Sequence, residues 1–419
     1  MAKCPFDQVF PRDPRDFIAD PVPVEHEMAT ACPVIEIPRL NMVMIGGYDQ
    51  VVEAAKDNIR FVTALPSLDH ARSAQDRKSR GLDRPFPRLL LAWGQDHYFT
   101  RRMVDACSTL DDREHWQPIF TEAAAEAFAD LPRGSVVDLA PASERIAYGM
   151  LMAALGLDWA DEPERAQIMD WFHAIEISFS HFGNRKQRMA AADALLDYYD
   201  WLEALIQRRR DDPQRDIISN LVSGDWQLHD EPAPRPLTDW EVTGLIRQLM
   251  LAGANSVRSQ LLNCVLELCR DPALQSQLRA DPALIPPFVE ECLRLRSSVP
   301  GMWRSSATEF SFYDVPVQDG QLVQLRYKAT GLDPDKFPDP YRIRLDRPKT
   351  PRHLAFGYGI HNCLGKDFAR HQLGIALAGL LSKTQQITLG CEEADLRWLP
   401  SLAIHGVYEL PVVLTGEAT

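Results

Sequence analysis

The sequence has no long apolar run and no close pair of cysteines. No apolar stretch among its 419 residues approaches the ~18 residues that span a membrane, and the first residues lack the apolar core of a signal peptide. We therefore expect a cytoplasmic protein without a membrane anchor. The eight cysteines show no CxxC spacing, which argues against a disulfide framework, and we expect reduced thiols.

An excess of positive charge is also missing. The formal net charge of -14 argues against a nucleic-acid-binding surface, and we find no internal repeat or low-complexity tract. With 45% apolar residues, a chain of this length can bury a sizeable core, either in one large domain or in two or three. Composition alone leaves the number of domains open.

One segment, residues 353–365, places a single cysteine on a glycine-rich loop. Gly357, Gly359 and Gly365 allow backbone conformations that a side chain would forbid, so the loop can approach a flat ligand closely. From Lys366 onward, apolar residues recur at helical spacing. Cys363 is thus expected at a helix N-terminus, where amide N–H groups and the helix dipole favour a thiolate.

A lone thiolate of this kind suits haem iron better than zinc. Zinc takes four ligands at paired spacings, whereas the nearest cysteines in sequence are Cys292 and Cys391. Most cysteines in such loops are merely small buried residues. However, with 17 Phe, 22 Gly and 8 Cys in the chain, a Phe-Gly-x5-Cys-x-Gly pattern arises by chance in roughly one such chain in a thousand.

This loop resembles the cysteine loop of the cytochrome P450 family, whose members bind haem through one axial cysteine thiolate. The residues that carry the resemblance are Phe356, Gly357, Gly359, His361, Cys363 and Gly365. The resemblance implies haem b with Cys363 as the iron ligand, Phe356 and Gly357 beside the cofactor, and His361 on a propionate. It also implies one mainly α domain over residues 1–419 with a minor β part, the P450-like α+β fold.

The remaining chain is consistent with that fold. Residues 1–33 are rich in Pro and Asp and predict an irregular lead-in, after which Val34–Ile37 and Met42–Ile45 predict a small β element. Residues 63–92 predict a loop, which the resemblance would place over the substrate pocket. The aromatic segment 171–183 predicts either ordinary core or a lid over that pocket.

Three further residues are candidates for binding the haem propionates. His97 and Arg101 share one face of a helix and together suit a carboxylate. In isolation a solvated basic helix face would be the commoner explanation, but bacterial P450s carry a propionate-binding His-x-x-x-Arg at this place. Arg304 precedes strand-like residues and resembles the propionate-binding arginine of the family.

A capping box at Thr238 to Glu241 predicts the start of one long helix over residues 239–270, roughly 48 Å long. Small residues around Gly253 indicate either a packing seam or close approach of a flat ligand. They resemble the oxygen-activating segment of P450s, where an acid and an alcohol supply protons. Ser256 keeps the alcohol, whereas Asn255 stands at the place of the usual acid and cannot ionise. We expect both to act in catalysis, with protons arriving through ordered water.

Glu291 and Arg294 are three residues apart on an apolar helix, a pattern that is weak evidence alone. It matches the Glu-x-x-Arg of P450s, which forms a structural network with a later arginine. We predict Arg347 as that third member, with Arg344 as the alternative.

Together these features predict a monooxygenase that inserts one atom of O2 into a lipophilic small molecule, since thiolate donation favours O–O cleavage. No flavin or iron–sulfur segment is recognisable, so a separate ferredoxin or flavodoxin with its reductase is the expected electron donor. Its expected docking face carries Arg102, Arg352, Lys366 and Arg370. Asn255 keeps open a peroxide-using or rearranging haem-thiolate enzyme, and a non-catalytic haem sensor or carrier is a further alternative. The sequence does not indicate the substrate.

Overall fold

A computed structural model describes residues 17, 21–63, 88–90, 92–110, 112–157, 162–179, 185–399 and 401–416. The chain divides into two compact units. Unit 1 comprises Met1–Ala64, Arg113–Ala147 and Asn255–Thr419, and unit 2 comprises Leu65–Asp112 and Tyr148–Ala254. Helix α8 (Ala140–Leu155) begins in unit 1 and ends in unit 2.

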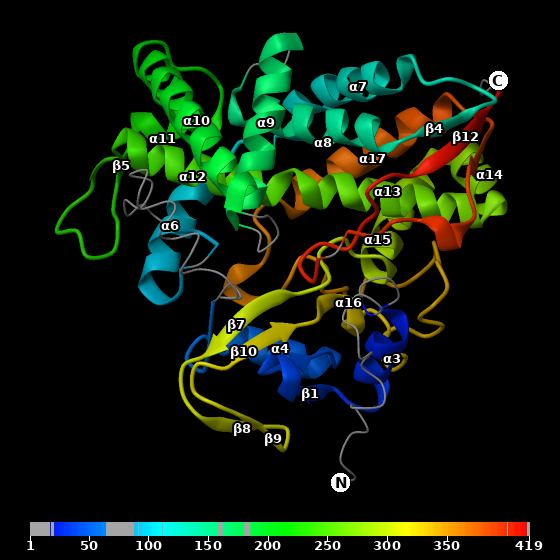
Figure 1. Ribbon diagram of the computed structural model, residues 1–419, viewed down its shortest axis with the longest axis horizontal. Coiled ribbons are helices and arrows are strands. Elements are labelled where there is room, and N and C mark those ends of the chain that lie inside the picture. Colours follow the sequence, from blue (N-terminus) through cyan, green and yellow to red (C-terminus); the bar gives the residue numbers. More distant parts are fainter. Residues whose placement is uncertain are drawn as a thin grey trace. The chain divides into compact units, whose positions relative to one another are not determined.

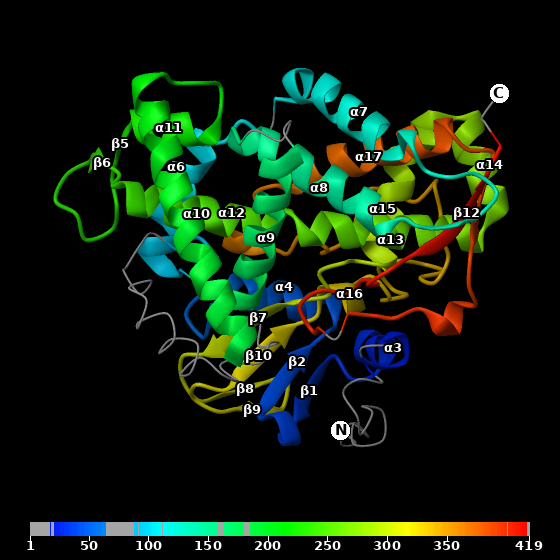
Figure 2. The same ribbon diagram turned by 45° about the horizontal axis from the view of Figure 1, so that its top comes forward.

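Unit 1 contains a five-stranded sheet in the order β1-β2-β10-β7-β3 (Figure 2). Its strands are β1 (Val34–Ile37), β2 (Met42–Ile45), β3 (Phe61–Thr63), β7 (Met302–Ser306) and β10 (Leu322–Leu325). Only the β2–β10 pair is parallel among these strands. Alternate residues of β2 enter different cores: Val43 and Ile45 join one cluster, and Met42 and Met44 join the other. The predicted β element at residues 34–45 is thus confirmed.

The helices of unit 1 lie on both sides of the cysteine loop in sequence. They are α3 (Val22–Thr30), α4 (Tyr48–Lys56), α7 (Arg113–Ala129), α13 (Asn255–Arg270), α14 (Pro272–Ala280), α15 (Ile285–Leu295), α16 (Tyr327–Thr330) and α17 (Lys366–Ser382). Helix α17 packs against α7, α13 and α15 (Figure 1). Small sheets complete the unit: β11 (Gln386–Leu389), β12 (Pro411–Thr415) and β4 (Val136–Asp138) form one, and β8 (Phe310–Phe312) and β9 (Val315–Val317) form another.

Unit 2 is almost entirely helical. It contains α6 (Gly94–Cys107), α9 (Glu162–Phe179), α10 (Arg185–Asp211), α11 (Ile217–Ser223) and α12 (Asp239–Gly253), with a short ribbon of β5 (Asp225–Trp226) and β6 (Arg235–Pro236). Helix α10 packs against α9, α11 and α12. Rings of Trp171, Tyr198 and Trp201 meet between α9 and α10, with the centroids of Trp171 and Trp201 4.9 Å apart. These contacts give Trp171 the core role that was one of the two predicted alternatives.

Two predicted elements differ from the structure. The helix expected over residues 239–270 is two consecutive helices, α12 and α13, which meet at Ala254; its φ of -86° and ψ of -70° lie at the edge of the right-handed helical region. Its start is as predicted: the capping box of Thr238 and Glu241 is present. The lead-in predicted to be irregular contains α3, because prolines are tolerated at a helix start and Val24 and Met28 are buried on it.

Three sequence expectations concern the chain as a whole. Among the described residues, no helix is both long and apolar enough to cross a membrane. Cys32 is disulfide-bonded, so the expectation of reduced cysteines throughout is wrong at that position. Residues 64–87 and 180–183 lie outside the described residues, and with them most of the loop and the end of the lid segment predicted over the substrate pocket.

Candidate functional site

The loop that carries Cys363 is closed by hydrogen bonds within its own sequence. The Cys363 amide donates to the Phe356 carbonyl at 2.9 Å. The side-chain amide of Asn362 donates to the carbonyls of Phe356 and Gly357, at 3.1 Å each. The loop therefore folds back on the predicted aromatic residue and holds the cysteine beside it.

Two of the three glycines predicted to shape this loop have left-handed backbone conformations, with φ angles of 71° at Gly357 and 74° at Gly359. The prediction is wrong for Gly365, whose φ is -86° and where a Cβ would meet no atom within 4 Å among the described residues. A Cβ at Gly359 would lie 2.5 Å from the carbonyl oxygen of Ala55, so this position also requires the absence of a side chain.

The Cys363 sulfur is exposed and forms no disulfide. Helix α17 begins at Lys366 with Gly365 as its N-cap, so the thiol precedes the positive end of the helix by a few residues. The role of Cys363 as an iron ligand stays a prediction.

Glu290, His353, Arg370 and Phe356 form a group behind the loop, here called the Glu290 cluster. Arg370 binds Glu290 with two hydrogen bonds of 2.6 and 3.0 Å, and its guanidinium carbon lies 4.5 Å from the centroid of the Phe356 ring. His353 Nε2 lies 3.1 Å from Glu290 Oε2. Because the Ala355 amide donates to His353 Nδ1, the Nε2–H donates to Glu290. Burial acts to raise the Glu290 pKa, but His353 and Arg370 lower it to about 2.

Sequence reasoning missed this cluster. Arg370 was interpreted as a docking residue, and His353 and Glu290 were given no role. The available signals were the first residue of the loop motif, His353, and the second acid next to Glu291.

The predicted Glu291 network is present on α15. Arg294 donates to both Glu291 oxygens at 2.8 and 2.9 Å, and Arg347 Nε donates to Oε1 at 2.8 Å. Arg347 is the third member as predicted, because the Arg344 side chain binds Asp346 and only its amide reaches Glu291. Burial opposes ionisation, yet the hydrogen bonds and charge of Arg294 lower the Glu291 pKa.

Arg304, on β7, is 2% exposed and has an unsatisfied donor. Its Nη1 donates to the Trp303 carbonyl at 2.8 Å, while Nη2 is buried with no hydrogen-bond partner among the described residues. Burial raises the pKa of neighbouring Tyr327, so its hydroxyl remains neutral. A buried guanidinium N–H without an acceptor is costly. A carboxylate would satisfy it, which fits the propionate role predicted from the sequence.

Asn255 and Ser256 open helix α13, and both are half-buried. The Ser256 carbonyl accepts a hydrogen bond of 2.7 Å from the Ser298 hydroxyl. A Cβ at Gly253, the end of α12, would lie 3.0 Å from the Leu151 side chain. Helix packing therefore explains Gly253, and its contact with a cofactor stays a prediction.

His97 and Arg101 lie on α6 in unit 2. His97 is buried, and Arg101 Nε binds both Asp105 oxygens at 2.9 and 3.0 Å. Their propionate contact stays a prediction. His361 lies in the short 3-10 turn Gly359–His361 of the cysteine loop in unit 1.

The cations predicted to attract an electron donor are partly engaged. Lys366 pairs with Asp367 at 3.1 Å, and Arg352 lies over the Tyr358 ring at 5.9 Å. In unit 2, Arg102 donates to the Tyr98 hydroxyl at 3.1 Å. Arg370 belongs to the Glu290 cluster, so removing its charge would also disturb the cysteine loop.

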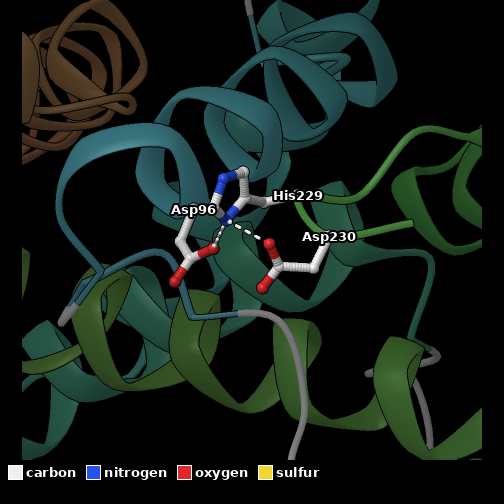
Figure 3. A group of neighbouring side chains, drawn as sticks. All are labelled: Asp96, His229 and Asp230. Carbon is white, nitrogen blue, oxygen red and sulfur yellow. Dashed lines mark ion pairs between the residues drawn. The ribbon is translucent and has the colours of Figure 1, made fainter. Parts of the chain in front are cut away.

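A second group with metal-ligand chemistry lies in unit 2 (Figure 3). His229 Nδ1 is 2.8 Å from Asp96 Oδ1 and 3.4 Å from Asp230 Oδ1, and the three side chains point toward one another. All three are at least 40% exposed. Since exposed groups of this kind commonly form ion pairs without a metal, we interpret them as contacts that fasten the loop before β6 to α6.

Comparisons with known proteins agree with the chemistry of the cysteine loop. The sequence profile described as Cytochrome P450 matches residues 162–386. The mycinamicin IV hydroxylase/epoxidase of Micromonospora griseorubida is 32% identical over 326 residues, 76% of this chain and 77% of that protein. The cyclomarin C epoxidase of Salinispora arenicola is 32% identical over 312 residues, 73% and 76% of the two chains.

Solved structures include a close match in fold. P450BioI, in complex with an acyl carrier protein ligated to hexadec-9Z-enoic acid, has a TM-score of 0.80 to this chain at 25% identity. The match covers 96% of this chain and 99% of that chain. It confirms the predicted mainly α fold with a minor β part.

Proposed function

Because the chain belongs to the cytochrome P450 family and is a P450 monooxygenase, we propose that it binds haem b through the Cys363 thiolate and oxidises a lipophilic small molecule. When bound, thiolate-ligated haem supplies O2 activation through electron donation from sulfur. The observation that carries this proposal is the Cys363 loop, with its exposed thiol ahead of α17 and its two left-handed glycines.

The basic residues would bind the propionates. The unsatisfied Nη2 of Arg304 supports this role most directly, since a carboxylate would accept its hydrogen bond. We assign His361, His97 and Arg101 to the same task on the pattern of the family. Phe356 and Gly357 would face the cofactor as part of the cysteine loop.

The first residues of α13 would deliver protons for the reaction. An amide holds water through a donor and an acceptor but releases no proton as an acid. Asn255 would therefore orient water, and the Ser256 hydroxyl would pass the proton along the water chain. With this arrangement, protons for the monooxygenase reaction would be delivered without the usual acid.

Electrons would come from a separate ferredoxin or flavodoxin. Arg352 and Lys366 support this partner, because both lie on the segment that holds the cysteine loop. Replacing each with Gln should slow the first electron transfer severalfold at low ionic strength and leave substrate-induced spectral shifts unchanged. Equal rates in wild type and both variants would contradict this docking face.

Lipophilic substrates are proposed because the relatives are named for mycinamicin IV and cyclomarin C, and P450BioI was solved with a fatty acyl chain on its carrier protein. Asn255 favours one alternative, a reaction driven by peroxide. Faster product formation with peroxide than with O2 and reduced ferredoxin would favour that alternative.

The decisive experiment is the absorption spectrum of the reduced, carbon monoxide-bound protein. Wild type should show the strongly red-shifted Soret band of thiolate ligation, and Cys363→Ala should lack it. Cys391→Ala is the matched control, since Cys391 is a free thiol outside the cysteine loop, and it should keep the band. Haem-loaded, folded wild type without the band would overturn the proposal.

A further inference from the structure

A small cavity in unit 1 is lined by donors from segments far apart in sequence. Arg326 follows β10, and Ser401 and His405 lie in the loop before β12. Among the described residues, the cavity is also lined by Phe17, Pro21, Pro300 and Leu402. The cavity has a volume of about 10 Å³, which is room for one water or one small ion.

Three nitrogen atoms of the side chains that line this cavity have no hydrogen-bond partner among the described residues. Arg326 is 2% exposed and its Nε is unsatisfied, and His405 is 7% exposed with both ring nitrogens unsatisfied among the described residues. The Ser401 oxygen already accepts two backbone N–H groups at 3.1 Å, which leaves its own hydrogen to donate. The cavity is thus lined by three side chains that each have a hydrogen to donate, and the second nitrogen of the His405 ring is their one acceptor without a partner among the described residues.

The charges beside the cavity do not balance. Glu25, fully buried on α3, contacts Arg326 directly and lies 3.5 Å from the Lys328 amine. Burial lowers the Lys328 pKa to about 8, with Glu25 opposing the shift, so the amine is mostly protonated at pH 7. Arg296 is also near, but Glu267 binds it at 2.8 Å. In the described part of the chain, one carboxylate therefore lies beside two buried cations.

An excess buried positive charge is costly unless an anion accompanies it. His405 does not add to it, because burial and the charges of Lys328, Arg296 and Arg326 lower its pKa well below the usual value. Its ring stacks on Trp398, with centroids 4.5 Å apart, and offers one neutral N–H.

We propose that this cavity binds one small monovalent anion, chloride in the cell, held by Arg326, Ser401 and His405. The anion compensates the excess positive charge of the Glu25, Arg326 and Lys328 group. It also connects the loop before β12 to the end of β10 in the five-stranded sheet. The site is separate from the cysteine loop in sequence and does not depend on haem chemistry.

Thermal unfolding of the haem-loaded protein tests this site. At constant ionic strength, replacing sodium gluconate with sodium chloride should raise the unfolding temperature in proportion to the logarithm of chloride concentration above its Kd. His405→Phe keeps the ring on Trp398 but removes the donor, and it should weaken chloride binding by about tenfold. Arg397→Gln, in an exposed ion pair of the same segment, should respond like wild type.

Crystals soaked in bromide provide a second measurement that needs no variant. Anomalous scattering should locate one bromide within hydrogen-bond distance of Arg326 and His405 in wild type. Equal unfolding temperatures in chloride and gluconate, or a soaked crystal without this peak, would mean that the cavity holds water only and would overturn the proposal.

Discussion

Glu290→Gln tests whether the Glu290 cluster supports the cysteine loop. The substitution keeps the shape of the side chain but removes the charge that Arg370 and His353 contact. A Glu290 pKa of about 2, against the usual 4.5, corresponds to about 3 kcal/mol of preference for the charged form. Because the side chain is 41% exposed, solvent screening reduces this value. We expect the variant to lose about 1–2 kcal/mol of unfolding free energy at pH 7.

The loss of unfolding free energy in the Glu290→Gln variant should become smaller as the pH falls. The folded-state pKa of Glu290 lies below its unfolded value, so its contribution is complete above the unfolded pKa and disappears as pH falls through about 2. The difference between wild type and variant should therefore shrink steadily as the pH is lowered from 6 toward 2. Urea unfolding of the haem-loaded proteins over this range measures it.

The same variant should alter the cysteine ligand. Arg370 lies over the Phe356 ring, and the Phe356 carbonyl accepts a hydrogen bond from the Cys363 amide. A shift of Arg370 should therefore move Cys363 through these two contacts. A larger fraction of the reduced carbon monoxide complex should lack the red-shifted band. Glu409→Gln breaks an exposed ion pair and is the control, with an expected change below about 0.5 kcal/mol. Equal stability losses at every pH, or an unchanged band, would refute the reasoning.

Three more substitutions have clear expected outcomes. Glu291→Ala leaves Arg294 buried and uncompensated, and should cost about 3–5 kcal/mol in chemical unfolding. Arg344→Ala should leave the unfolding free energy almost unchanged, because in the described part of the chain its side chain pairs with the exposed acids Asp339 and Asp346; similar losses in both variants would contradict the assignment. Asn255→Asp should change the ratio of product formed to electrons consumed, and an unaltered ratio and rate would remove this position from proton delivery. Gly359→Ala should reduce haem content, which the ratio of Soret to protein absorbance reports.

Local sequence patterns identified those parts of the site whose residues lie close together in the sequence. Gly357 and Gly359 of the cysteine loop have the left-handed φ that their residue type indicated. Glu291 and Arg294 meet one helical turn apart, and the capping box of Thr238 and Glu241 begins α12 where the pattern placed it. In each case the interacting atoms belong to one turn or one loop, so backbone geometry alone brings them together.

Tertiary packing decided the contacts between distant residues. Glu290 meets His353 and Arg370, 63 and 80 positions away, and Glu25 meets Arg326 across 301 positions. Helical or strand periodicity shows which face of an element is buried but not which charge lies opposite it. Arg370 therefore looked like a free surface cation in the sequence. Only the packing of α15 against α17 placed its charge against Glu290 and its guanidinium against the loop that carries Cys363.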